Sequence, residues 1–319
     1  MLVNCPLRPL VMPPLTTRSR CPPIPRNSNP RIWEASFMSL NAVKAGAFTH
    51  HLSLTSLEPE RLARYYSDTM DMSPPEKHGA GWLVRGPGRR LIVSQGARNG
   101  LLHVGMGVRD QDALAELQAH CAAQGLSPQP FAGELYAAGS PGAFSVTDPD
   151  GNTIAFGLAR EEGPSRSLRG PLQHVTFATR DIARFEQFYA GKLGFAVSDY
   201  VVRESDGKVT TVFMRSNHEH HTIGVFQQDR TGLDHHSYEA GEWGVLKDWC
   251  DRFADRRIRL DWGPGRHGPG NNLFAFITDP DGNWIEISAE LEVVHGRPAK
   301  TWKHEERTLN LWGPGRLRT

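Results

Sequence analysis

Residues 271–288, NNLFAFITDPDGNWIEIS, and residues 142–157, GAFSVTDPDGNTIAFG, contain the same six-residue segment, TDPDGN. This segment predicts a tight turn, because Pro fixes φ, Asp and Asn bond their own backbone, and Gly takes positive φ. The apolar runs beside each copy predict that the turn joins two strands. The strands that follow differ at one corresponding position, which is Glu286 in the second copy and Ala155 in the first. A duplicated structural unit therefore carries a carboxylate in only one copy.

The similarity extends to two segments that precede each turn. The stretch THHLSLTSLEPERLARYYSDTMDM (49–72) parallels LQHVTFATRDIARFEQFYAGKLGF (172–195). Likewise, LLHVGMGVRDQDALAELQAHCAAQG (101–125) parallels LDHHSYEAGEWGVLKDWCDRFADRR (233–257). Each segment has the pattern of a short strand with a leading His, then a turn, then an amphipathic helix. Self-similarity of this length indicates duplication of an α+β module.

The duplication predicts an α+β fold of two tandem modules of paired βαβββ units, each forming a curved mixed sheet around a cavity. We expect residues 1–38 to be a disordered N-terminal extension, or a stretch upstream of the natural start at Met38, because Pro at this density prevents regular structure. Residues 39–165 are then a degenerate N-terminal module, and residues 166–319 a catalytic C-terminal module with a tail. The charged segment 160–170 is the expected linker.

Bulk composition excludes several classes of partner. Lys+Arg (36) and Asp+Glu (35) nearly cancel, which argues against binding to nucleic acid or to an acidic membrane surface. No apolar run approaches the ~18 residues that a membrane-spanning helix needs. The four cysteines are scattered without a CxxC pair, so they predict neither a disulfide framework nor a zinc knuckle and favour a cytoplasmic location.

Three potential metal ligands occupy corresponding strand positions in the second half: His174 in HVTF, His235 in HHSY and Glu286 in WIEIS. Alternate residues of a strand share a face, so strands that curve around one cavity could bring these side chains together. Two His and one carboxylate form the facial triad of non-haem Fe(II) enzymes, although imidazole also suits Zn, Ni and Cu. The alternative is three ordinary core residues. Their registration in a repeat, and the cost of burying an unpaired Glu, favour the metal site.

Residues 172–291 resemble the type I extradiol (meta-cleavage) catechol dioxygenases of the vicinal oxygen chelate superfamily. That family's signature is a His, a spacer, an aromatic residue, Asp-Pro, Gly and a ligand Glu. The stretch GRHGPGNNLFAFITDPDGNWIE supplies it, with His267 first, Phe276 as the aromatic and Glu286 last.

Two further stretches extend the resemblance. The segment FMRSNHEHHTIGVF resembles the strand that carries the family's distal acid–base histidine, and His221 is at the matching position. The closing segment KTWKHEERTLNLWG (300–313) resembles the family's C-terminal tails. The neighbouring His218 and His220 are interpreted as part of a solvated turn.

The resemblance implies that His174, His235 and Glu286 bind Fe(II), with Mn(II) as the other candidate. The implied substrates are O2 and a catechol-type aromatic diol, substituted or biaryl, that is cleaved in aromatic-compound catabolism. His221 would act as an acid–base group, and His267 would hydrogen-bond a substrate oxygen or the ring-cleavage oxyanion. Family members often form tetramers or larger assemblies, so the resemblance also implies a homo-oligomer.

Phe276 departs from the family pattern, which usually has Tyr there in contact with a substrate oxygen. Without that hydroxyl, His267 and His221 could make the contact, Tyr238 could replace it spatially, or the second oxygen of the substrate could be handled differently. The aromatic ring could also serve packing alone. Phe276 and Tyr238 are therefore candidate substrate-binding residues, and Trp302, in the closing segment 300–313, is a third as a candidate for the pocket wall.

His51 and His103 correspond to the two His ligands of the second half, whereas Ala155 replaces the carboxylate. We therefore expect the first half to keep the scaffold without the chemistry. Two other functions stay open: a glyoxalase-like metal-dependent isomerase or transferase, and a binding protein for small aromatics. The first usually builds each site with ligands from both modules, which Ala155 argues against. The second has no need of Glu286.

Overall fold

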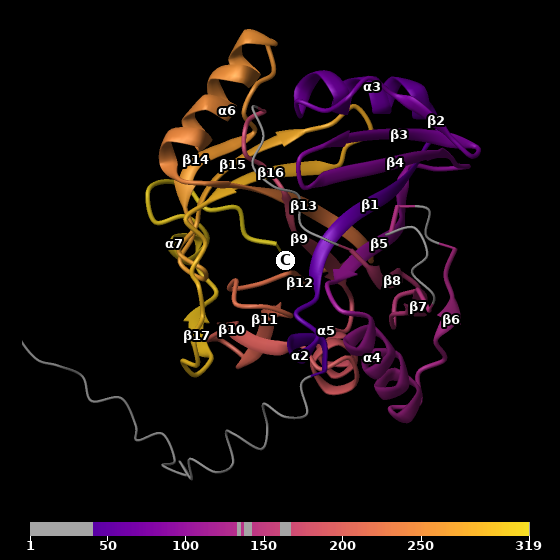
Figure 1. Cartoon of the computed structure of the whole chain (residues 1–319). Helices are drawn as coiled ribbons and strands as arrows, with labels where there is room; N and C mark the ends of the chain where they lie inside the picture. The colour runs from indigo at the N-terminus through magenta and orange to yellow at the C-terminus, as the bar shows by residue number, and fades with distance from the viewer. Residues whose placement is uncertain (1–40, 133–134, 137–141, 160–166, 319) are drawn as a thin grey trace, which may run out of the picture.

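The computed structural model describes most of the chain after the predicted N-terminal extension (Figure 1). The described residues are 41–132, 135–136, 142–159 and 167–318. The predicted extension, 1–38, and most of the predicted linker, 160–170, therefore lie outside the described residues.

An eight-stranded sheet forms from the first half, in the strand order β2-β3-β4-β1-β5-β8-β7-β6. Its strands are β1 (Phe48–Ser56), β2 (Glu76–His78), β3 (Gly81–Gly86), β4 (Arg89–Gln95), β5 (Gly100–Val108), β6 (Gln129–Pro130), β7 (Phe144–Thr147) and β8 (Thr153–Leu158). The described helices of this half are α2 (Asn41–Lys44), α3 (Pro59–Thr69) and α4 (Gln111–Ala123).

The second half forms a nine-stranded sheet in the order β14-β15-β16-β13-β9-β12-β11-β10-β17. Its strands are β9 (Leu172–Thr179), β10 (Ala196–Arg203), β11 (Lys208–Arg215), β12 (Ile223–Gln227), β13 (Gly232–Gly241), β14 (Trp262–Arg266), β15 (Leu273–Thr278), β16 (Trp284–Ala289) and β17 (Lys300–Lys303). Its helices are α5 (Ile182–Glu186), the π-helix η1 (Gln187–Lys192), α6 (Trp243–Asp255) and α7 (Glu306–Leu309).

The two sheets repeat one pairing scheme. Strand β1 is antiparallel to β5, which is parallel to β8, and β9 is antiparallel to β13, which is parallel to β16. Both sheets curve, and α3 of the first half lies near α6 of the second (Figure 1). Arg252 of α6 donates to the carbonyl of Thr69 at 3.0 Å, which joins these two helices. The predicted α+β fold with two curved mixed sheets is confirmed.

Each TDPDGN turn receives a tyrosine from the other half of the chain. Asp148 accepts from Asn152 within its own turn and from Tyr189 of η1, whose hydroxyl lies 3.2 Å away. In the same manner, Asp279 accepts from Tyr66 of α3 at 2.9 Å. The repeated turn thus has a structural role in both halves, because it joins the modules as well as the strands. This explains why the motif persists in a half that lacks the carboxylate.

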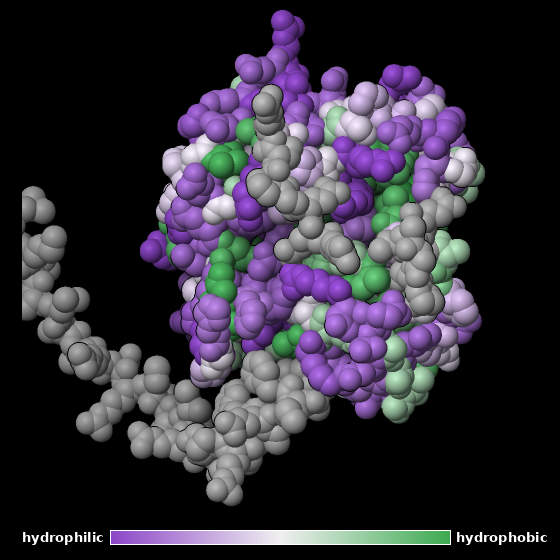
Figure 2. All heavy atoms as spheres, in the orientation of Figure 1, coloured by the Kyte–Doolittle hydropathy of each residue, from purple (hydrophilic) through white to green (hydrophobic). Residues whose placement is uncertain are grey.

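One apolar core runs through both halves and includes Leu52, Phe156, Phe177 and Trp249, each fully buried. The surface drawn in Figure 2 is mainly hydrophilic, with small separate hydrophobic patches. Among the helices of the described segments, none has the length and apolarity required to cross a membrane.

Candidate metal centre

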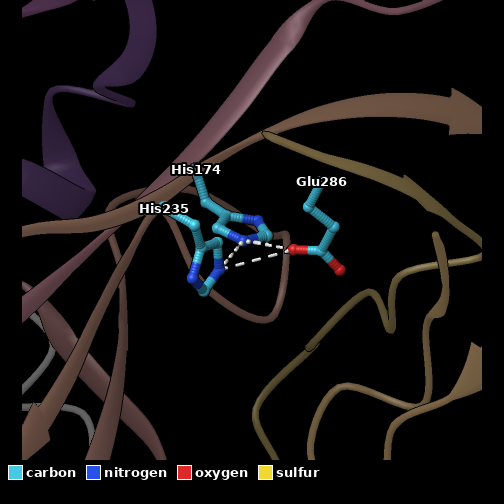
Figure 3. Close-up of side chains that lie close together, drawn as sticks. All are labelled: His174, His235 and Glu286. Carbon is cyan, nitrogen blue, oxygen red and sulfur yellow. Dashed lines mark hydrogen bonds and ion pairs between the residues drawn. The ribbon is translucent and has the colours of Figure 1, made fainter. Parts of the chain in front are cut away.

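The side chains of His174, His235 and Glu286 converge from three adjacent strands (Figure 3). On β13, Ser237 pairs with His174 of β9 on one side and with Glu286 of β16 on the other, so these residues form one row across the sheet. His235 lies two residues before Ser237 and therefore shares its face. The predicted registration of the three strands is what brings the potential ligands together.

The three candidate ligand atoms form a small triangle. His174 Nε2 lies 3.3 Å from His235 Nε2 and 3.0 Å from Glu286 Oε2, and His235 Nε2 lies 3.5 Å from the same oxygen. Ligands about 2.1 Å from one metal ion are separated by about 3.0 Å in an octahedral arrangement and about 3.4 Å in a tetrahedral one. The donor set and spacing therefore fit a divalent metal ion. Within the described residues, no other group of three or more His, Cys, Asp or Glu side chains brings its ligand atoms this close.

Burial and mutual hydrogen bonding set the charges of the three groups. His174 and Glu286 are each 1% exposed, and burial lowers the pKa of His174. Burial opposes ionisation of Glu286, but contacts with His174, His235 and His267 outweigh it and hold its pKa well below the usual range. Burial likewise opposes protonation of His235, yet Asp234 and Glu286 raise its pKa. A buried carboxylate held ionised beside two imidazoles is a ready ligand for a cation.

A second layer of side chains orients each ligand. His174 donates from Nδ1 to the amide oxygen of Gln173, and His235 Nδ1 lies 2.7 Å from Asp234 Oδ1. These contacts place a ring proton on each Nδ1, so a bound metal ion would take the two Nε2 positions. Asn272 donates to Glu286 Oε1 at 3.1 Å and fixes the carboxylate plane.

His221 and His267, the predicted acid–base and hydrogen-bonding residues, both line the cavity beside the triad. The His221 ring centroid lies 4.2 Å from that of His174, and burial holds its pKa well below the usual range. His267 stacks on Phe274, with ring centroids 4.0 Å apart, and its Nδ1 lies 2.5 Å from the carbonyl oxygen of Leu309. Its Nε2 lies 3.6 Å from Glu286 Oε1 and faces the cavity.

The structure places only one of the three candidate substrate-binding residues in the cavity. Phe276 lines it, edge-on to His235 with ring centroids 5.3 Å apart. Tyr238 is instead buried in the core beside His236, because it lies one residue from Ser237 on β13 and so points to the opposite face. Trp302 packs behind the cavity wall, against Phe213 and Phe226, and donates to Asp199 at 2.8 Å. The suggestion that Tyr238 could replace the missing hydroxyl is therefore wrong.

Sequence reasoning missed residues that reach the site from distant positions. Arg318 lines the cavity, donates to Asp234 at 3.1 Å and lies 4.6 Å above the Phe226 ring. The interpretation of His220 as part of a solvated turn is also wrong, because it is fully buried beside Asp199. Adjacency to His221 was the only signal in the sequence for it.

The cavity is small and mostly aromatic. Its lining side chains enclose about 30 Å³, whereas a single water needs about 10–15 Å³. An aromatic diol therefore requires movement of part of the lining, and Arg318 is the lining residue from the end of the described chain. The lining residues are His174, Phe213, His221, Phe226, His235, Trp262, His267, Pro269, Asn272, Phe276, Glu286, Leu309 and Arg318.

The first half repeats the row without the carboxylate. Gly105 of β5 pairs with His51 of β1 and with Ala155 of β8, as Ser237 pairs with His174 and Glu286 in the second half. His51 Nε2 lies 3.1 Å from His103 Nε2, so the two imidazoles still meet. The Tyr136 ring packs against His51, with centroids 5.2 Å apart, and forms an apolar cluster with Ala155.

Comparisons with known proteins agree with this geometry. Residues 172–287 match the family model described as the Glyoxalase/Bleomycin resistance protein/Dioxygenase superfamily. Metapyrocatechase 2 of Cupriavidus necator is 26% identical over 194 residues, which cover 52% of this chain and 59% of that protein. The chain thus matches less than two thirds of the length of that relative.

Two solved structures have a similar fold. An anaerobic substrate complex of homoprotocatechuate 2,3-dioxygenase from Brevibacterium fuscum has a TM-score of 0.72 at 21% identity, covering 85% of this chain and 89% of that chain. The Mn(II)-bound glyoxalase from Novosphingobium aromaticivorans has a TM-score of 0.71 at 21% identity, covering 84% and 91%. Because a dioxygenase and a glyoxalase are equally similar in fold, the fold alone does not separate the two activities.

Proposed function

We propose that this chain, in which residues 172–287 match the Glyoxalase/Bleomycin resistance protein/Dioxygenase superfamily model, is a metal-dependent extradiol dioxygenase. The observation that carries the proposal is the buried triad of His174, His235 and Glu286 with His221 directly beside it. The proposed reaction cleaves one ring C–C bond of a catechol-type diol. Both atoms of O2 enter the ring-opened product, so no external reductant is needed.

The three ligands would hold Fe(II), with Mn(II) as the second candidate. When bound, the metal would provide the site that the two diol oxygens chelate, and it would supply the chemistry that activates O2. The protein's own contribution is to hold the diol and O2 in one small, water-poor cavity, where proximity replaces a bimolecular encounter. Glu286, buried and ionised, would supply the anionic ligand that the first half lacks.

His221 and His267 are the proposed proton-handling groups. His221 would take a proton from a diol hydroxyl and return it to the product, because its ring lies against His174 in the cavity wall. His267 donates through Nδ1 to the Leu309 carbonyl, and its Nε2 faces the cavity, where it can hydrogen-bond a substrate oxygen. His267 would in this way make the hydrogen bond to the substrate that Phe276, which has no hydroxyl, cannot make.

Aromatic side chains would bind the ring of the substrate. Phe213, Phe226, Trp262 and Phe276 line the cavity, and flat apolar walls of this kind suit an aromatic diol, substituted or biaryl. Arg318, in contact with Asp234, would move when the ring enters. A cytoplasmic location and a homo-oligomeric state complete the proposal.

A glyoxalase-like isomerase or transferase is the second candidate, and the fold similarity to the Mn(II)-bound glyoxalase favours it. That reading gives His221 no task. It also expects ligands from both halves, whereas the carboxylate position of the first half is Ala155, buried among apolar side chains. A binding protein for aromatics would need neither Glu286 nor a metal.

Anaerobic loading with Fe(II), Mn(II) or Zn(II), followed by O2 uptake with a panel of catechols, tests the three readings. The dioxygenase predicts O2 consumption and a coloured ring-cleavage product, both abolished in Glu286→Gln and retained in the exposed control His218→Gln. Turnover with Zn(II) in the absence of O2 would support the isomerase. Binding of diols that survives in Glu286→Gln, without metal or turnover, would support the binding protein.

A further inference from the structure

A line of three buried residues runs from the cavity into the protein behind it. His221 Nδ1 lies 3.0 Å from His220 Nδ1, and His220 Nε2 lies 3.0 Å from Asp199 Oδ2. Asp199 and His220 are both 0% exposed, and His221 is 4% exposed. The line thus connects a buried carboxylate on β10 to the proposed acid–base residue through one imidazole.

Donors surround the carboxylate of Asp199 on both oxygens. Oδ1 accepts from Arg297 Nη1 at 2.8 Å and from the backbone N–H of Lys300 at 3.0 Å. Oδ2 accepts from Trp302 Nε1 at 2.8 Å. Burial opposes ionisation of Asp199, but His220, Arg297 and Trp302 outweigh it and bring its pKa to about 2. Asp199 is therefore a fixed anion at neutral pH.

A fixed anion dictates where the neighbouring ring protons lie. A bare Nε2 lone pair of His220 facing an anionic oxygen at 3.0 Å would be repelled, so Nε2 carries the proton even without an aligned hydrogen bond. With its proton on Nε2, His220 can accept a hydrogen bond at Nδ1, and the proton between the two rings belongs to His221 Nδ1. That leaves His221 Nε2 without a proton, and His221 lines the cavity.

We propose that Asp199 and His220 are positioning residues that keep the proton of His221 on Nδ1 and present its bare Nε2 to the substrate. The catalytic meaning of this arrangement rests on the proposed dioxygenase function, in which His221 first accepts a proton. Trp302 then has a defined role, because it donates to the carboxylate of Asp199 and helps to hold it in place.

Asp199→Asn is the informative substitution. Two donors, Arg297 and Lys300 N–H, face the Oδ1 position, and one donor, Trp302, faces the Oδ2 position. The amide oxygen therefore takes the Oδ1 position and the amide nitrogen faces His220. His220 Nε2 becomes the acceptor, its Nδ1 donates to His221 Nδ1, and the His221 proton moves to Nε2. The acid–base residue then enters the reaction in the wrong tautomer.

The test is an NMR measurement of isotope-labelled histidine rings in the Zn(II)-loaded protein, with His221 assigned by its loss in His221→Gln. We expect the wild-type proton on Nδ1 and the Asp199→Asn proton on Nε2. In the Fe(II) protein, kcat for catechol should fall about 100-fold with KM within about twofold, the range of an acid–base contribution. The exposed Asp206→Asn is the matched control and should change neither quantity.

A second variant covers the case in which Asp199→Asn does not fold. His220→Leu removes the acceptor from Nδ1 of His221, so the single-tautomer signal should give way to a mixture, while the exposed control His218→Leu keeps it. A wild-type proton on Nε2, or a tautomer unchanged by both variants, overturns the proposal. The ring spectrum does not depend on turnover, so it decides the positioning role even if no diol in the panel is oxidised.

Discussion

Replacement of Asp234 should weaken metal binding without removing any ligand. Asp234 Oδ1 lies 2.7 Å from His235 Nδ1, and Asp234 is almost fully buried. Burial raises its pKa, but Arg318 and His235 outweigh burial and keep the carboxylate ionised. The contact is therefore charge-assisted, and such bonds are about twice as strong as neutral ones.

The expected loss follows from that contact. Outer-shell partners of metal-binding His typically account for 10–100-fold in affinity, about 1.4–2.7 kcal/mol. Asp234→Ala removes both the charge and the hydrogen-bond acceptor, so we expect the affinity for the metal to fall about 100-fold. Asp234→Asn keeps an acceptor oxygen and should lower the affinity for the metal about 10-fold. Gln173→Ala removes a neutral acceptor from His174 and should lower this affinity by a similar factor.

Competition with a coloured chelator measures these affinities for Zn(II) or Co(II). Arg318→Ala separates the metal effect from the loss of the Arg318 contact, because it leaves the pair of Asp234 and His235 in place. Asp206→Asn, at an exposed position, is the control variant and should bind the metal with wild-type affinity. If Asp234→Ala binds metal as tightly as the wild type, the assigned orienting role is refuted.

Three further predictions concern the cavity, the turns and Asp199. Arg318→Ala enlarges the cavity, so the kcat/KM for a biaryl diol should rise relative to the kcat/KM for catechol in steady-state assays. If the ratio of these two kcat/KM values does not change, Arg318 does not limit entry of the larger diol. Tyr66→Phe and Tyr189→Phe each remove one hydrogen-bond donor from the Asp of a turn, so each should lower the free energy of unfolding, measured in urea, by about 1 kcal/mol. The two effects should add in the double variant. An unchanged free energy of unfolding in both single variants would contradict the role of the turns in joining the two halves. The folded protein lowers the pKa of Asp199 from 3.8 to about 2, so ionised Asp199 stabilises the fold at pH values above 3.8, and this stabilisation is lost as the pH falls towards 2. The difference in free energy of unfolding between the wild type and Asp199→Asn should therefore decrease in urea titrations from pH 5 to pH 2.5. A difference that increases over this range would contradict the lowered pKa.

The fold and the triad could be predicted because both depend on local rules. The repeated turn has strong local chemistry, and alternation along a strand places His235 and Ser237 on one face. The same alternation excludes Tyr238 from the cavity, because it lies one residue from Ser237.

Other features depend on contacts between segments far apart in the chain, which the sequence does not reveal. Trp302 reaches Asp199 because β17 pairs with β10, and Arg318 reaches Asp234 from the end of the chain. The burial of His220 follows from the same long-range packing, since its ring meets a carboxylate from β10. The sequence analysis interpreted only His220 as part of a solvated turn, and the assembled sheet shows that it is buried.

The central claim is that the second half carries a metal site that inserts O2 into an aromatic diol. Its most direct test is turnover of catechol by the Fe(II)-loaded protein under isotopically labelled O2, with the product analysed by mass spectrometry. We predict a ring-opened product that contains both labelled oxygen atoms. An unlabelled product with the mass of the substrate, formed equally well without O2, would contradict it.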